Sequence, residues 1–121
     1  MEFKDSKGIF QQIADNICEK IISGEYPVFS KIPSVREQAA VMGVNHNTIM
    51  RTYMELQREN IINNQRGIGY FVTEEAPQRI VQLRKEEFFR HEMPEFIRQV
   101  KLLNLSQEEL KPLFDQLNKQ P

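Results

Sequence analysis

A stretch near the middle of the chain, beginning at Ser34, carries the start and stop signals of two consecutive helices joined by one short turn. Ser34 and Glu37 form a capping box, in which each side chain accepts a hydrogen bond from the other residue's backbone N–H at a helix start. Gly43 ends this short first helix, and Asn45 is a natural N-cap for a second helix that runs to about Glu59. This arrangement predicts a helix-turn-helix.

The hydrophobic pattern changes from a helical period to that of a strand directly after these helices. Residues 61–63 and 70–72 are typical of two short strands, and residues 65–69 between them contain two glycines suited to a tight turn. Asn60 tolerates positive φ and is expected to close the preceding helix. A hairpin in this place is a wing, so the segment predicts a winged helix-turn-helix.

An amphipathic helix precedes the motif. From about Lys7 to Gly24, apolar residues recur every three or four positions and form one stripe to be buried. The stripe includes the lone cysteine, Cys18, which we expect to be an inert core thiol. Residues 26–33 predict an irregular connector because prolines near both ends exclude helix.

A helical tail without glycine follows, over residues 78–121. We expect Pro94 in the first turn of one helix and a second capping box at Ser106, with Pro112 kinking the last helix or moving its start. So long an apolar surface exceeds what a small winged domain needs as cover, which favours pairing with a second copy over packing on the same chain. The side chains expected at that interface are Phe88, Phe89, Phe96, Ile97, Val100 and Leu103.

Composition leaves room for one domain with an appendage and argues against several classes of function. The chain has 121 residues, a net charge of −1 and one cysteine, so a broadly basic nucleic-acid binder, a disulfide framework and a cysteine-based zinc site are not indicated. No membrane span, signal peptide, catalytic cluster or phosphate loop is recognisable. We therefore expect a cytoplasmic protein that is not an enzyme and binds no cofactor, metal or membrane.

The start of the second helix carries side chains suited to the major groove of DNA. Asparagine can pair with adenine through two hydrogen bonds, threonine can contact a phosphate or a thymine methyl group, and the N–H groups at a helix start favour phosphates. Arg36 on the capped helix and Arg66 at the wing tip are placed to contact the DNA backbone or a groove. The short polar side chains at the helix start are Asn45, His46, Asn47 and Thr48.

Residues 9–73 resemble the DNA-binding domain of the GntR family of bacterial regulators. Five separate motifs carry this resemblance in the family's order, namely IFQQIA, ISGEY, IPSVRE, GVNHNTI and RGIGYFV. The short helical tail resembles the YtrA-type subfamily, whose members are homodimers with genes often beside ABC transporter operons. Phe29 and Asn60 stand where the family commonly has glycine, and His46 where it often has proline; at Phe29 this departure allows for a reshaped connector.

The resemblance implies a homodimeric, sequence-specific transcription regulator, which we interpret as a repressor of an inverted-repeat operator, with a transporter operon as one candidate target. Residues 1–76 would form the winged helix-turn-helix DNA-binding domain and residues 77–121 the helical dimerisation region. The sequence indicates double-stranded operator DNA and a second copy of the chain as partners. It does not identify an effector ligand. The DNA contacts implied by position are Arg36, Asn45, His46, Asn47, Thr48, Arg51, Arg66 and Gly67.

Two other interpretations remain open at this stage. Winged helices also serve as protein-interaction modules, so the motif alone does not fix the partner. The helical tail is alternatively a sensor for a small ligand, although it carries no obvious polar set for one and a bundle so short leaves little room for a pocket. Arg58 is expected to form a surface ion pair with Glu55 or Glu59 rather than a DNA contact.

Overall fold

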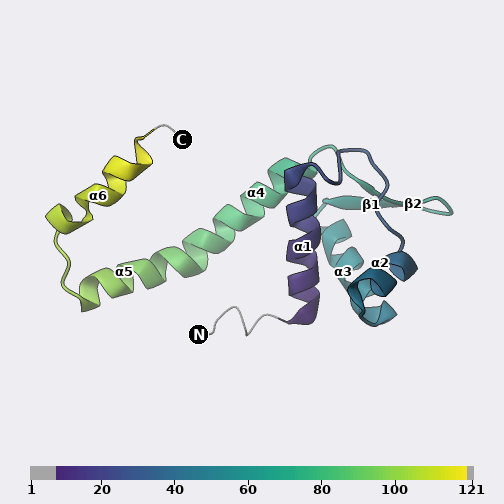
Figure 1. The fold of residues 1–121 in the computed structure, drawn as a ribbon, viewed down its shortest axis with the longest axis horizontal. Helices are drawn as coiled ribbons and strands as arrows, with labels where there is room; N and C mark the ends of the chain where they lie inside the picture. Colours follow the sequence, from purple (N-terminus) through teal and green to yellow (C-terminus); the bar gives the residue numbers. More distant parts are fainter. Residues whose placement is uncertain (1–7, 120–121) are drawn as a thin grey trace. The chain divides into compact units, whose positions relative to one another are not determined.

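The computed structural model describes residues 8–119, which form helices and one β-hairpin (Figure 1). The chain divides into two compact units, the first ending at Leu83 and the second beginning at Arg84. The expected fold class, mainly helical with a three-helix winged helix-turn-helix and a helical tail, is confirmed. In chain order the elements are α1 (Ile9–Ser23), α2 (Val35–Met42), α3 (His46–Arg58), β1 (Ile62–Gln65), β2 (Gly69–Val72), α4 (Ala76–Glu87), η2 (Phe88–Glu92), α5 (Met93–Leu102) and α6 (Gln107–Leu117).

Helix α1 buries the predicted apolar stripe against the rest of the first unit. Ile17 is fully buried and Cys18 is 8% exposed, which confirms the cysteine as a core residue. Gly24 ends the helix in the left-handed region with φ at 89°, and its N–H donates to the carbonyl of Ile21 at 3.2 Å. The predicted start at Lys7 lies outside the described residues.

The two helices of the motif begin and end where their capping residues predicted. The N–H of Ser34 donates to the Glu37 carboxylate at 2.9 Å, and the N–H of Glu37 donates to the Ser34 hydroxyl oxygen at 3.1 Å. Hydrogen bonds that the Ser34 backbone N–H and then its hydroxyl donate to the Glu37 carboxylate hold the pKa of this carboxyl below its usual value. Gly43 closes α2 with φ at 66°, and Asn60 follows α3 with φ at 64°, as expected of residues that tolerate this conformation.

Strands β1 and β2 pair antiparallel to form the wing. Ile62 lies opposite Val72 and Gln65 lies opposite Gly69. Ile62 and Val72 are both 1% exposed, so this end of the hairpin is anchored in the core while the turn lies in solvent. Strand β1 extends to Gln65, beyond the predicted limit at residue 63, because backbone pairing continues after the apolar residues stop.

The connector before α2 is not irregular throughout, contrary to the prediction. The N–H of Phe29 donates to the carbonyl of Val72 at 2.9 Å, and the N–H of Ile32 donates to the carbonyl of Tyr70 at 2.9 Å. The connector therefore runs along β2, where Lys31 forms an isolated antiparallel bridge with Phe71, and the sheet itself has two strands. Its prolines exclude helix but leave the extended backbone between them free to pair.

Phe29 has a left-handed backbone conformation, with φ at 71°. Glycine adopts this conformation without strain, whereas a residue with a Cβ atom pays roughly 1–2 kcal/mol. The side chain itself is 68% exposed, so little burial offsets this strain. Phe29 therefore adopts a left-handed backbone conformation that favours glycine, at a position where the GntR family commonly has glycine.

The core of the first unit includes the beginning of α4. Ala76 and Ile80 are at most 1% exposed, and Leu83 packs against the same cluster. Arg79 fixes α4 to the end of α3, because its guanidinium lies 2.6 Å from the Glu59 carboxylate and its Nε donates to the Glu59 carbonyl at 3.3 Å. The boundary predicted after residue 76 therefore falls inside the first unit, since the apolar residues that follow it complete the core.

The second unit contains a turn of π-helix at η2. The N–H of Met93 donates to the carbonyl of Phe88, five residues earlier, instead of the usual four. Pro94 follows in the first turn of α5, as predicted. Proline has no N–H, and its ring would collide with the carbonyl four residues before it, so a locally widened helix accommodates Pro94 without a helix break.

Helix α6 opens with the second capping box. The N–H of Ser106 donates to the Glu109 carboxylate at 2.9 Å, and the N–H of Glu109 donates to the Ser106 hydroxyl oxygen at 3.1 Å. Pro112 lies inside α6, so the start of the helix is not moved by it. None of the helices in residues 8–119 is long and apolar enough to cross a membrane.

Candidate nucleic-acid interface

A buried hydrogen-bond chain fixes the two helices of the motif against each other. The Gln38 amide of α2 donates to the hydroxyl of Tyr53 on α3 at 3.1 Å, and that hydroxyl donates to the carbonyl of Pro33 at 2.7 Å. Gln38 is 1% and Tyr53 0% exposed, and burial raises the pKa of the Tyr53 hydroxyl to about 12. The hydroxyl therefore stays protonated and able to donate at neutral pH.

The same tyrosine joins α3 to the wing. The rings of Tyr53 and Tyr70 meet edge to face, with centroids 4.9 Å apart and an interplanar angle of 73°. Thr52, beside Tyr53, is also fully buried, and its hydroxyl donates to the carbonyl of Thr48 at 2.8 Å. The core thus holds the inward side of α3 in place, and the opposite side of the helix consequently faces solvent.

The first turn of α3 is exposed and capped by its own side chain. The side-chain oxygen of Asn45 accepts from the N–H of Asn47 at 2.7 Å, so this oxygen is engaged within the chain. The side chains of His46 and Asn47 are exposed, and Thr48 is half-buried. The predicted polar helix start is therefore accessible, but the four residues are not equivalent, because Asn45 caps the helix and Thr48 lies partly within the fold.

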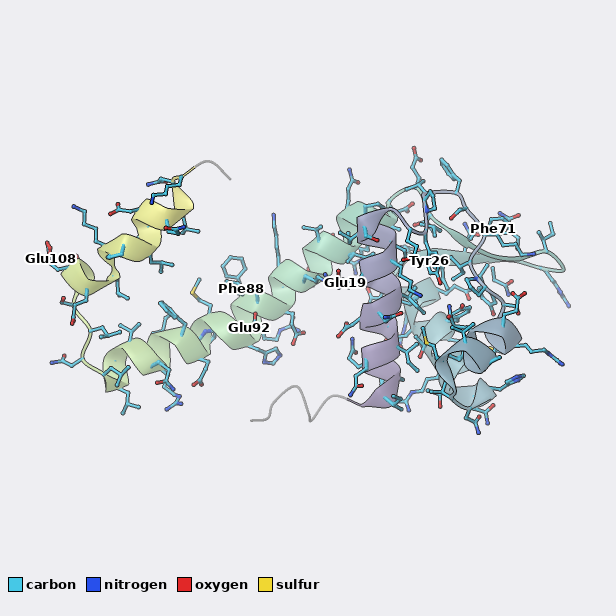
Figure 2. All side chains as sticks on the ribbon, in the orientation of Figure 1. Glu19, Tyr26, Phe71, Phe88, Glu92 and Glu108 are labelled. Carbon is cyan, nitrogen blue, oxygen red and sulfur yellow. The ribbon has the colours of Figure 1, made fainter. Side chains whose placement is uncertain are left out.

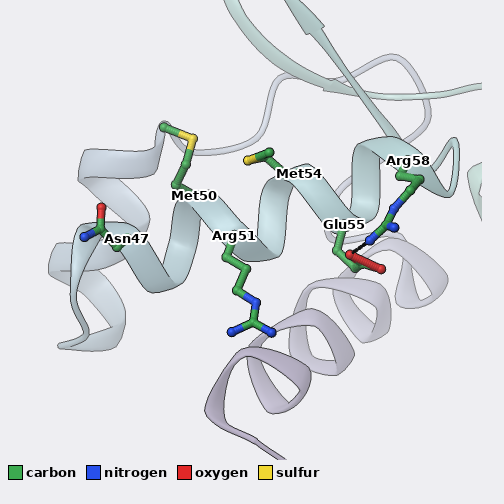
Figure 3. A pocket seen from close by; sticks show the side chains of 6 residues that line it. All are labelled: Asn47, Met50, Arg51, Met54, Glu55 and Arg58. Atoms are coloured by element: carbon green, nitrogen blue, oxygen red, sulfur yellow. Dashed lines mark hydrogen bonds and ion pairs between the residues drawn. The ribbon is translucent and has the colours of Figure 1, made fainter.

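The outward side of α3 borders an open hollow of about 600 Å³ (Figure 3). Arg51 leaves α3 toward α1, and its guanidinium lies 4.3 Å from the ring centroid of Phe10. Arg58 forms an ion pair with Glu55, as the sequence predicted. The residues that line the hollow are Asn47, Met50, Arg51, Met54, Glu55 and Arg58.

The other predicted contact residues lie on α2 and on the turn of the wing. Arg36 is an exposed residue of the first turn of α2, and Arg66 is exposed at the wing tip. Gly67 has φ at 80° in this turn, and the N–H of Ile68 donates to the Gln65 carbonyl at 2.8 Å. The turn therefore requires a residue that accepts a left-handed backbone directly after Arg66.

Sequence reasoning missed four residues on or beside this surface. Lys31 lies across the wing, so that a Cβ atom added to Gly69 would come within 2.6 Å of its Cε atom. Phe10 supplies the ring beneath Arg51. Met50 and Met54 are 42% and 62% exposed on the outward side of α3. Helical spacing places both methionines on the same side of α3 as Asn47, so this spacing was a signal that could have found them, whereas Lys31 and Phe10 are distant in sequence and gave no such signal.

The residues predicted for dimerisation are accessible in the isolated chain. Phe88 and Phe96 are 42% and 44% exposed, and the rings of Phe88 and Phe89 meet edge to face with centroids 5.4 Å apart. The Phe88 ring projects from its helix into solvent (Figure 2). Ile97 and Leu103 are also exposed, while Val100 is half-buried. The second unit, described by itself, thus carries an apolar surface that none of its described residues covers.

Comparison with known proteins identifies the family. The model of the gntR family of bacterial regulatory proteins matches residues 9–72. The HTH-type transcriptional regulator YhcF of Bacillus subtilis is 41% identical over 90% of this chain and 88% of its own length. The HTH-type transcriptional repressor YtrA of the same organism is 37% identical over 65% of this chain and 61% of its own length.

A solved structure extends this similarity into the tail. A GntR-family transcriptional regulator from Bacteroides thetaiotaomicron superposes with a TM-score of 0.79 at 43% identity, over 91% of this chain and 96% of that one. Coverage this high, like that of YhcF, includes helical residues beyond the 9–72 match. The chain belongs to the GntR family of bacterial regulatory proteins, and it is a transcriptional regulator and not an enzyme.

Proposed function

We propose that the protein is a homodimeric repressor that binds an inverted-repeat operator in the cytoplasm, with α3 in the major groove and the wing against the adjacent backbone or minor groove. The observation that carries this proposal is the exposed polar start of α3, where His46 and Asn47 face solvent while Tyr53 and Thr52 hold the opposite side in the core. A recognition helix enters the groove with its N-terminal residues toward the base edges.

The charges around this surface fit DNA in spite of the net charge of −1. Arg36 on α2 and Arg66 at the wing turn belong to two elements that both pack against α3, and both side chains are exposed. A few placed cations are sufficient for phosphate contacts, which position a protein on the duplex, while base contacts give it specificity. We therefore assign Arg36 and Arg66 to backbone or groove contacts, and Asn47 to base contact.

Arg51, which the resemblance implied as a DNA contact, is assigned to the DNA backbone in this proposal. Its guanidinium stacks over Phe10 and lies on the α1 side of α3. From there it is suited to a phosphate at the edge of the groove, because the stacked guanidinium keeps its charge and several of its N–H donors. We propose a phosphate contact for Arg51, with His46, Thr48 and Gly67 as further contacts.

The exposed apolar side chains of the second unit support the homodimer. An uncovered surface that includes Phe88, Phe89 and Phe96 is an aggregation hazard in a monomer, and a two-fold dimer covers the same patch on both copies. Such a dimer presents two α3 helices to half-sites about one helical turn apart, roughly 34 Å, or a multiple of that distance. The sign of regulation follows the relative YtrA, which is named a repressor.

The experiment is a fluorescence polarisation titration of the full chain against labelled duplexes from the region upstream of its gene. Arg36→Ala and Arg66→Ala should each weaken binding several-fold, and each should reduce the slope of log affinity against log salt by about one if the residue contacts a phosphate. Lys20→Ala, which removes a cation at the end of α1, is the matched control and should leave both quantities unchanged. Unchanged binding in both arginine variants would overturn the proposed docking.

A further inference from the structure

We infer that Met50 and Met54 form an apolar pair that recognises the C5-methyl groups of thymines in the operator's major groove. The inference rests on the proposed function, because it places α3 in that groove. It extends the function by naming the chemical feature that the middle of the helix distinguishes. Neither methionine was among the contact residues that the sequence indicated.

The first argument is position along α3. Asn47, Met50 and Met54 are spaced by three and four residues, so they lie on one side of the helix. Figure 3 shows Met50 and Met54 leaving α3 on the same side, away from the α1 side taken by Arg51. All three side chains line the same hollow. A helix inserted with its start at the base edges therefore brings the two methionines onto the next base pairs in the groove.

The second argument is exposure. Met50 is 42% and Met54 62% exposed, although the neighbouring inward residues Ile49 and Tyr53 are fully buried. Two large apolar side chains left in solvent on a helix whose other side supplies the core form a small uncovered patch continuous with Asn47. Contact with an apolar group of the bound partner would remove this patch from water.

The third argument is the shortage of other base-contacting groups in the hollow. Glu55 and Arg58 are paired with each other, and Arg51 is stacked on Phe10. Among the residues that line the hollow, Asn47 has the polar side chain whose amide makes no hydrogen bond or ion pair with another residue of 8–119. In the major groove the apolar feature of a base pair is the thymine methyl group, and no other standard base carries one there.

Together these observations predict the composition of each half-site. Adenine faces the Asn47 amide through its N6 and N7 atoms, and one or two thymine methyl groups lie against Met50 and Met54. The flexible, unbranched methionine side chain suits this contact because it adapts to the groove's contour. Burying one methyl group corresponds to about fourfold in affinity, and the same change in both half-sites of a dimer to about fifteenfold.

The test removes only the methyl groups. The full chain first selects its preferred duplex from a random pool, and that duplex is then synthesised with each half-site thymine replaced in turn by deoxyuridine, which lacks the C5-methyl and keeps every hydrogen-bonding group. Affinities are measured by fluorescence polarisation. We expect about a fourfold loss at one or two thymines per half-site, and no difference between thymine and uracil at those positions in Met50→Ala or Met54→Ala.

Ile22→Ala provides the matched control, because Ile22 is an apolar residue with the same 42% exposure as Met50 but lies at the end of α1. This variant should keep the full thymine preference. Thermal unfolding checks that each alanine variant is folded, which its exposed position predicts.

The possible results separate the inference from the function on which it rests. If a specific duplex is selected but no thymine is sensitive to uracil, methyl recognition is overturned and the regulator's DNA binding stands. If replacing thymine by uracil weakens the binding of the methionine variants as much as it weakens the binding of the natural chain, another residue contacts the methyl group. The assignment to Met50 and Met54 is then overturned. If no sequence is selected, the proposed DNA binding itself is overturned, and the inference with it.

Discussion

The Gln38 amide donates a hydrogen bond to the Tyr53 hydroxyl at 3.1 Å, and this fully buried contact joins the two helices of the helix-turn-helix. Its partner bond, from the Tyr53 hydroxyl to the Pro33 carbonyl at 2.7 Å, ties the connector to the same point. Three segments that are separate in sequence thus meet at one hydroxyl group. The outward direction of α3, on which the proposed function depends, follows from this arrangement.

Tyr53→Phe should lower the free energy of unfolding by about 1–3 kcal/mol, because it leaves a buried carbonyl and a buried amide without their partner. Urea unfolding followed by circular dichroism measures this. Tyr70→Phe is the matched control, since the Tyr70 hydroxyl makes no hydrogen bond within residues 8–119. Equal stability of the two variants would contradict the role given to the Tyr53 hydroxyl.

The raised pKa of Tyr53 predicts an alkaline loss of stability. Between pH 10 and about 12 the unfolded chain releases the tyrosine proton while the folded chain, with a pKa of about 12, retains it. The free energy of unfolding should therefore be unaffected by this group below pH 10 and should fall above it, by up to about 1.4 kcal/mol per pH unit. Subtracting the same curve for Tyr53→Phe isolates this part, and parallel curves would count against the burial of the hydroxyl.

Phe29→Gly should be at least as stable as the natural chain. The φ of 71° costs phenylalanine roughly 1–2 kcal/mol, and glycine's larger entropy loss, about 0.5–1 kcal/mol, offsets only part of the gain. Phe29→Val should be the least stable of the three, because a β-branched residue tolerates this conformation poorly. Chemical unfolding ranks the variants, and a valine variant more stable than the glycine variant would contradict the strain at this position.

Phe96→Glu should dissociate the dimer. A charge placed in a covered apolar interface loses its hydration without gaining a partner. Sedimentation velocity over a range of concentrations should show the natural chain as a dimer and this variant as a monomer. Phe114→Glu, which changes an exposed aromatic residue of α6 outside the predicted interface, should remain dimeric. A monomeric natural chain would remove the basis for the two-fold operator.

Local signals in the sequence predicted most of the helix boundaries, because caps act within a few residues. Ser34 with Glu37, Gly43 and Asn45 each have the place and conformation that their chemistry predicts. The alternation of apolar residues located the hairpin, but its length depends on backbone pairing that continues past them to Gln65.

Contacts between distant segments could not be predicted in the same way. The contacts of Phe10 with Arg51 and of Lys31 with Gly69 are between residues far apart in the chain, and no short sequence pattern predicts such a pair. The first compact unit extends to Leu83, beyond the boundary expected after residue 76, because Ile80 belongs to the core although it lies in a helix that continues into the tail. The π-helical turn before Pro94 lets the helix continue although proline does not fit a regular α-helix there. Composition gives no signal for such a turn.

The most direct test of the central claim, that the start of α3 lies in a DNA groove, is to map backbone amide chemical shifts by NMR as the selected duplex is added to the full chain. We predict that the largest changes fall on residues 45–51 and on the wing turn at 66–67, with little change in the buried part of α1. Changes confined to the second unit, with residues 45–51 unaffected at saturation, would contradict it.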